Sequence, residues 1–245
     1  MPILMFFLFA IVFLIVYFPL LLSLSNPGEL CGDTSIDAIF TNSKGETFVF
    51  LGSKFWKISN NSIASGYPRS ISVYWPGVPD DIDAAVFLPG QQENIIQFFK
   101  ENNYWLFYEW KNGQVSPSSD NPYNISRIGL PESGVDAAVQ RLKDNQVYFF
   151  SGSKYWKWNS VSRETQSGDI TDLWKGVPDN IEAATRLTNG KTYLFKSGKY
   201  WRLNDETGAV DEANPPYPRD AGKWWFGCPR PSLSTKKEED NEHQF

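Results

Sequence analysis

The chain has 245 residues, of which 41% are hydrophobic and 21% charged, a composition typical of globular rather than disordered proteins. Its net charge is -5 at pH 7, and no run of Lys or Arg exceeds two residues. This excludes a protein that binds a nucleic-acid backbone, because such proteins present a basic face. The single histidine, His243, excludes any site built from several imidazoles.

The chain opens on a long apolar segment. Residues 3–24 include no charged side chain, and the first acidic or basic residue is Glu29. A helix of this length would span about 33 Å, enough to cross a bilayer core. We predict that residues 1–25 form a cleaved signal peptide, since small residues precede Asn26. The length of the segment also fits an uncleaved anchor, and a buried core helix is the third interpretation. Either of the first two places the remainder outside the cytosol.

The cysteines and two glycosylation sequences agree with export. Cys31 and Cys228 are the two cysteines of the chain, and an even number in an exported protein predicts a disulfide. Two free buried thiols are the alternative. Asn60 and Asn124 each begin an Asn-X-Ser sequence, which predicts N-glycosylation with modest specificity.

A pattern that occurs four times follows the apolar segment. Each copy opens with an acidic residue followed by Ala, and these acidic residues are 46, 53 and 46 positions apart. About twenty residues later each copy has an aromatic residue followed by Trp, with the Trp residues 49, 51 and 45 positions apart. A hydrophobic-Pro-acidic link ends three of the copies. The openings are at Asp37, Asp83, Asp136 and Glu182, and the aromatic pairs end at Trp56, Trp105, Trp156 and Trp201.

Each copy is predicted to contain short strands. Aromatic and β-branched runs are separated by turn residues, a pattern typical of β-hairpins. A weaker fourth strand and a short helical piece at 170–174 would complete the third copy. The predicted strands are 135–142, 146–150 and 154–158 in the third copy, and 192–196 and 199–203 in the fourth.

A unit of this size cannot bury both faces of its own sheet, whereas four such sheets arranged around an axis can. The sequence therefore predicts an all-β, four-bladed β-propeller. Small residues such as Ala at each opening suit the crowded centre, where four copies of the innermost strand meet. The aromatic–Trp pairs are predicted to fill the wedge-shaped gaps between blades.

The acidic openings, aromatic–Trp pairs, Pro links and bracketing cysteines together resemble the hemopexin repeat. The resemblance covers about 31–228 and implies a single propeller closed by one disulfide, similar to the C-terminal domains of matrix metalloproteinases. The second copy departs from the pattern, since 99–103 lacks the Gly of its siblings, and Ile39 stands where the others have a second Ala. The implied blades are about 33–80, 81–133, 134–179 and 180–228.

The resemblance also implies a calcium ion in the central channel. Hard cations bind oxygen ligands, including backbone carbonyls. In the family, the backbone oxygen of each opening acidic residue contributes to this site. Alternatively, the acidic side chains hydrogen-bond neighbouring blades around an empty or water-filled channel. The implied ligands are the carbonyl oxygens of Asp37, Asp83, Asp136 and Glu182.

Catalysis and haem binding have little support in the sequence. Zinc proteases and Ser-His-Asp or Cys-His enzymes need positioned histidines, and the chain has only His243. Asp and Glu are plentiful, but nothing marks a catalytic carboxylate pair. For haem, Met1 and Met5 lie in the predicted signal peptide, both cysteines are predicted to be bridged and His243 lies outside the repeats, which leaves only Tyr as an axial ligand. We therefore expect neither an enzyme nor tight haem binding.

The expected function is that of a secreted binding module. By resemblance, its partners would be extracellular proteins such as matrix components or metalloproteinases, recognised through the propeller faces and rim loops. A haem or small-ligand carrier and a membrane-tethered propeller are the alternatives. Once the signal is cleaved we expect no membrane association, and the sequence leaves the oligomeric state open. Residues 229–245 are polar and of mixed charge, and are predicted to be a disordered tail.

Overall fold

The computed structural model describes residues 27–31, 35–159 and 161–229. The predicted signal peptide or anchor at 1–25 lies outside these ranges, as does the predicted tail apart from Pro229. Within the described ranges, no helix is long and apolar enough to cross a membrane.

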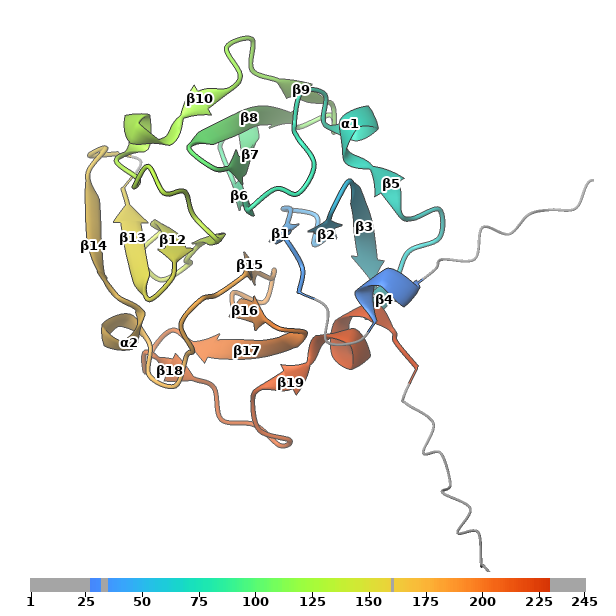
Figure 1. The fold of residues 1–245 in the computed structure, drawn as a ribbon, viewed down its shortest axis with the longest axis vertical. Helices are drawn as coiled ribbons and strands as arrows, with labels where there is room; N and C mark the ends of the chain where they lie inside the picture. Colours follow the sequence, from blue (N-terminus) through green and yellow to red (C-terminus); the bar gives the residue numbers. More distant parts are fainter. Residues whose placement is uncertain (1–26, 32–34, 160, 230–245) are drawn as a thin grey trace, which may run out of the picture.

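Four antiparallel sheets surround a central axis, which confirms the predicted four-bladed propeller (Figure 1). In each sheet, here called a blade, the chain runs from the innermost strand outward. Blade 1 contains β1 (Ala38–Thr41), β2 (Thr47–Leu51), β3 (Lys54–Ser59), β4 (Ser62–Ile63) and β5 (Arg69–Ser70), and blade 2 contains β6 (Ala84–Leu88), β7 (Glu93–Lys100), β8 (Asn103–Trp110), β9 (Val115–Pro117) and β10 (Tyr123–Asn124). Blade 3 contains β11 (Ala137–Gln140), β12 (Val147–Ser151), β13 (Lys154–Trp158) and β14 (Thr165–Asp169), and blade 4 contains β15 (Ala183–Arg186), β16 (Thr192–Lys196), β17 (Lys199–Asn204), β18 (Ala209–Val210) and β19 (Arg219–Asp220).

A single helical turn follows the outer strand of each blade. The turns after blades 1, 2 and 3 carry the chain from the rim of one blade toward the centre of the next, and one further turn precedes blade 1. They are η1 (Pro27–Leu30), α1 (Ile71–Tyr74), η2 (Ile125–Ile128), α2 (Ile170–Leu173) and η3 (Gly222–Phe226).

The strands predicted for the third and fourth repeats are confirmed, with small differences in their bounds. The strand predicted at 135–142 is shorter, as β11, because its ladder ends at Arg141, whose N–H donates to the carbonyl of Gln146. The predicted helical piece at 170–174 is α2.

The outer edge of the blades differs from the single weak strand that the sequence suggests. In blades 1, 2 and 4 it consists of two short strands, whereas in blade 3 it is the continuous β14. Proline has no N–H for a ladder hydrogen bond. Pro68, Pro122 and Pro218 lie between the two short strands of their blades, whereas β14 contains no proline. The prolines therefore account for the interruption.

The hydrophobic core lies between neighbouring blades. Phe55 packs in the cluster between blades 1 and 2, whereas the adjacent Trp56 packs in the cluster between blades 4 and 1. Tyr104 of blade 2 and Trp156 of blade 3 contribute to one cluster between those blades. Because successive strand residues point to opposite faces, the pairs of blades 1, 2 and 3 each serve two interfaces, and in blade 4 Tyr200 packs in the cluster between blades 4 and 1. This confirms that the pairs fill the gaps between blades.

A disulfide and a hydrophobic cluster close the ring together. Cys31 and Cys228, 197 residues apart, form the predicted bridge, which ties the segment before blade 1 to the end of blade 4. Beside it, Leu30 packs in one cluster with Trp225 and Phe226 of η3.

We expect Cys228→Ser to lower the free energy of unfolding by about 2–5 kcal/mol, because the bridge restricts a long loop of the unfolded chain. Denaturant unfolding of the wild type and of the variant would measure the loss. The double variant Cys31→Ser/Cys228→Ser is the control and should lose a similar amount. Equal midpoints for the wild type and both variants would contradict the closing role of the bridge.

Candidate functional site

The central channel is lined by the innermost strands, of which β1, β6 and β15 are visible around the axis in Figure 1. Residues at the starts of these strands surround a cavity of about 410 Å³ at one mouth of the channel. Asp81 and Lys100 also line it. The four acidic residues that open the repeats all contribute to this mouth, namely Asp37, Asp83, Asp136 and Glu182.

The backbone hydrogen-bond ladder is irregular at each of the four opening acidic residues, directly before the inner strand begins. In blade 1, the N–H of Asp37 donates to the carbonyl of Phe50, yet Phe50 is the register partner of the next residue, Ala38. Two residues of the inner strand therefore face one residue of β2, as in a β-bulge, and the first of them falls outside the regular ladder. The same arrangement recurs with Asp83 and Ala84 opposite Phe99, Asp136 and Ala137 opposite Phe150, and Glu182 and Ala183 opposite Phe195.

Each of the four carboxylates accepts a hydrogen bond from the turn between the second and third strands of its own blade. Oδ2 of Asp37 accepts the N–H of Gly52 at 2.6 Å, and Oε2 of Glu182 accepts that of Ser197 at 2.7 Å. The corresponding donors in blades 2 and 3 are Glu101, at 2.6 Å, and Gly152, at 2.9 Å. These hydrogen-bond partners lie within each blade, not in the neighbouring blades as the alternative interpretation of the sequence proposed.

These hydrogen bonds also explain how the second repeat tolerates the loss of its glycine. All four donor residues have positive φ, which costs a residue with a side chain more than it costs Gly. Glu101, at φ 53°, and Ser197, at φ 48°, adopt it nonetheless. In both, the carboxylate of the opening residue accepts the turn N–H and stabilises this conformation.

Charges at this mouth are mostly negative. Burial raises the pKa of Asp37 above its usual value, and the nearby Asp81 adds to this, although the N–H of Gly52 acts in the opposite direction. Lys100 donates to Oδ1 of Asp83 at 3.0 Å. Burial alone would lower the pKa of Lys100, but the hydrogen bond and charge of Asp83 outweigh it and raise that pKa. Within the described part of the chain, no three His, Cys, Asp or Glu side chains are grouped to hold a metal ion.

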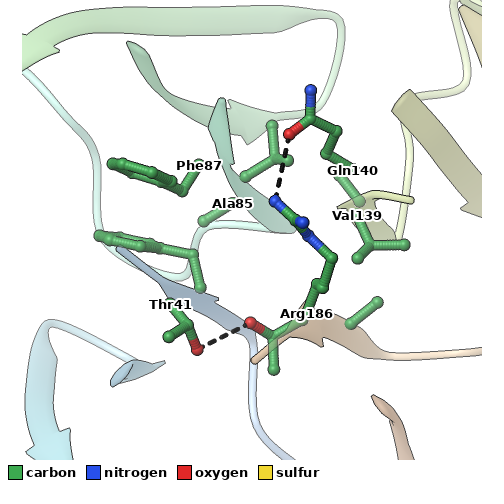
Figure 2. A pocket seen from close by; sticks show the side chains of 11 residues that line it. Thr41, Ala85, Phe87, Val139, Gln140 and Arg186 are labelled. Atoms are coloured by element: carbon green, nitrogen blue, oxygen red, sulfur yellow. Dashed lines mark hydrogen bonds between the residues drawn. The ribbon is translucent and has the colours of Figure 1, made fainter. Parts of the chain in front are cut away.

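The other end of the channel is narrowed by side chains from the ends of the inner strands. Figure 2 shows Arg186 extending from β15 across the channel toward Gln140 of β11, with 3.5 Å between Nη2 and Oε1. Thr41 and Thr185 share a hydrogen bond of 3.1 Å beside it. The space left is about 20 Å³, roughly that of one water molecule. Burial lowers the pKa of the Arg186 guanidinium, partly offset by Asp205.

The sequence analysis missed Arg186, although the repeats contain the signal. Arg186 is the fourth residue after the opening acidic residue, and the equivalent residues of the other repeats are Thr41, Phe87 and Gln140. All four line the narrow end. The channel therefore has an acidic mouth at one end and a guanidinium across the other.

The two predicted glycosylation sites lie away from the channel. Asn60 and Asn124 are both exposed. Oδ1 of Asn124 accepts the N–H of Ser126 at 2.9 Å, which caps the start of η2. Exposure is compatible with glycan attachment, which stays a prediction.

Comparison with known proteins gives one family. The hemopexin family model matches residues 36–80, 135–179 and 181–228, which correspond to blades 1, 3 and 4. Stromelysin-3 of Xenopus laevis is 31% identical over 157 residues, covering 62% of this chain and 30% of its own. Human vitronectin is 27% identical over 271 residues, covering 80% of this chain and 56% of its own. The chain thus spans less than two thirds of the length of these curated relatives.

The solved structures that resemble the chain agree on the fold. The hemopexin fold protein CP4 from cow pea aligns with a TM-score of 0.64 at 20% identity, covering 78% of this chain and 95% of its own. A plant lectin from Cicer arietinum aligns with a TM-score of 0.63 at 20% identity. At such identities the likeness concerns the fold alone.

The carboxylate–turn hydrogen bonds can be tested in blade 3. Asp136→Ala removes the acceptor for the Gly152 N–H and should lower the free energy of unfolding by about 0.5–1.5 kcal/mol. Asp136→Asn keeps a side-chain oxygen at the same place and should cost less. Both would be measured by thermal unfolding in the presence of a chelator, so that no metal contributes. Equal losses in the two variants would contradict the turn-stabilising role.

Proposed function

Because the chain belongs to the hemopexin family, we propose that it is a secreted, non-catalytic module that binds extracellular proteins. The observation that supports this most directly is an exposed aromatic residue on blade 2. Strands β7 and β8 each have eight residues, whereas β12 and β13 of blade 3 have five. Trp110 ends β8 with 43% of its surface exposed, and Val115 begins β9 with 38% exposed.

Exposed tryptophan is costly in water and is among the residues that contribute most to protein interfaces. The long hairpin of blade 2 holds Trp110 on rigid strands, so little conformational entropy would be lost on binding. Hydrogen bonding of the Trp110 indole N–H to Ser116 Oγ at 3.2 Å fixes the ring further. We therefore place the main protein contact at the end of blade 2.

We also propose that the acidic mouth of the channel holds a structural calcium ion. The residues fit this role in two ways: bulges leave the opening residues outside the ladder, and their carboxylates are engaged by turn N–H groups. Their backbone oxygens would be the ligands, and the surrounding negative charge would favour a cation. Bound calcium would offset the repulsion between carbonyl dipoles of four blades. The proposed ligands are the carbonyl oxygens of Asp37, Asp83, Asp136 and Glu182.

The protein-binding proposal predicts that Trp110→Ser weakens binding to an extracellular protein by about tenfold or more, since buried interface aromatics commonly contribute that much. Immobilised matrix proteins and metalloproteinases would be tested against the secreted full chain by interferometry. Leu142→Ser, a similar change at a 59% exposed residue of blade 3, is the matched control and should bind normally. The proposal fails if no such protein binds, or if both variants bind like the wild type.

The calcium proposal predicts that the protein melts at a higher temperature with calcium than with chelator. A ligand that binds only the folded ring stabilises it by about 2.7 kcal/mol at a hundredfold excess over Kd. Asp83→Asn should keep most of this stabilisation, because the proposed ligand is a backbone oxygen. An unchanged melting temperature after metal removal would rule out the ion. Loss of calcium dependence in Asp83→Asn would instead assign the binding to the carboxylate.

A further inference from the structure

The interface between blades 2 and 3 lacks an aromatic ring that fills the other three interfaces. In each blade the second strand has a Phe whose carbonyl accepts the N–H of the opening acidic residue. Two residues before this Phe, three of the blades have an aromatic residue that packs between blades, whereas blade 2 has Gln97. The aromatic residues are Phe48, Tyr148 and Tyr193.

Gln97 is buried without the hydrogen bonds that a buried amide requires. Only 4% of its surface is exposed. Its Oε1 has no hydrogen-bond partner within the described ranges. Most buried side-chain polar atoms are hydrogen-bonded, because an unsatisfied one costs free energy. An aromatic ring at this position, as in the other three blades, would avoid this cost.

A cavity of about 490 Å³ lies where the ring is missing, and Gln97 lines it. Leu88, Ile95 and Leu106 contribute from blade 2, and Trp158 contributes from blade 3. The long strands β7 and β8 extend blade 2 along this wall. A cavity of this size, lined by apolar and aromatic side chains together with several polar ones, can hold a small organic molecule.

The charges around the cavity favour an anion. Arg127 and Arg163 line it, and its lining includes no Asp or Glu, although the chain as a whole has a net charge of -5. The Arg127 guanidinium lies 4.8 Å from the centre of the Tyr123 ring, which holds it at the cavity wall. Arginine at such a place binds carboxylate, sulfonate or phosphate groups.

We propose that this cavity between blades 2 and 3 binds a small aromatic anion. Its ring would occupy the space filled by Phe48, Tyr148 or Tyr193 in the other interfaces. The ring would pack beside Gln97, and the anionic group would face Arg127 and Arg163. The site lies apart from the acidic mouth of the channel and from the protein contact proposed at the end of blade 2, although Gln140 lines both this cavity and the narrow end of the channel.

Two fluorescent probes test the proposal on the full chain. Anilinonaphthalene sulfonate combines an aromatic body, an N–H donor and a negative charge, and phenylnaphthylamine is its analogue without the sulfonate. The wild type should bind the sulfonate probe saturably at one site. Gln97→Tyr restores the ring found in the other interfaces, and should abolish this binding while keeping or raising the melting temperature.

Arginine variants test the charge independently of Gln97. Arg127→Ala should weaken the sulfonate probe by about tenfold and leave phenylnaphthylamine nearly unchanged, since it removes only a charge-assisted contact. Arg69→Ala is the matched control, because Arg69 lies over Tyr67 in blade 1 as Arg127 lies over Tyr123. It should bind both probes normally.

The other outcomes would overturn the proposal. These are the absence of saturable binding, equal binding by the wild type and a folded Gln97→Tyr variant, or equal effects of Arg127→Ala and Arg69→Ala. If Gln97→Tyr does not fold, the comparison of the two arginine variants still decides.

Discussion

Crowding at the propeller axis is the constraint on which the rest of the structure depends. Four inner strands meet there, so the residues that pack between neighbouring inner strands must be small. Ala38, Ala84, Ala137 and Ala183 are each at most 1% exposed. With little side-chain volume at the centre, hydrogen bonds rather than packing define the strand starts. The bulge and the carboxylate–turn hydrogen bond recur in every blade for this reason. The larger side chains are displaced outward, where the blades diverge and the aromatic–Trp pairs fill the gaps.

The sequence predicted well what the four repeats share. Strand positions, the inter-blade role of Trp56 and its equivalents, and the bridge between Cys31 and Cys228 all follow from patterns that recur or bracket the repeats. The sequence analysis did not predict the features that only one repeat has. Arg186 stands at a position where all four repeats differ, and Gln97 replaces an aromatic residue that the other three repeats share, so neither belongs to a recurring pattern. Their roles depend on the neighbouring blade. Arg186 reaches Gln140 of blade 3, and Gln97 lines a cavity together with Trp158 of blade 3.

The four interfaces are therefore not equivalent, despite the repeat. The one between blades 4 and 1 has the disulfide and Trp225 of η3. The one between blades 3 and 4 has a buried ion pair, in which Arg141 Nε lies 2.9 Å from Asp205 Oδ1, and the same guanidinium lies 5.4 Å from the Trp174 ring centre. Removing either partner would weaken the compensation of a buried charge, so this pair resists separation of the blades. The interface between blades 2 and 3 has Gln97 and a cavity in the place of such contacts.

A closed ring explains how one interface can be packed less tightly. Blades 1 and 2, 2 and 3, and 3 and 4 are joined by the chain itself, and blades 4 and 1 are joined by the disulfide. Every interface is thus covalently spanned, and separating any two blades requires strain in the other three. The unsatisfied Gln97 then lowers the stability of the whole ring, and it does not separate blades 2 and 3 alone. The family model passes over blade 2, whose strands are also the longest. Because the other blades close the ring, blade 2 can differ from them in sequence and strand length. Its sheet contains both Gln97 and Trp110.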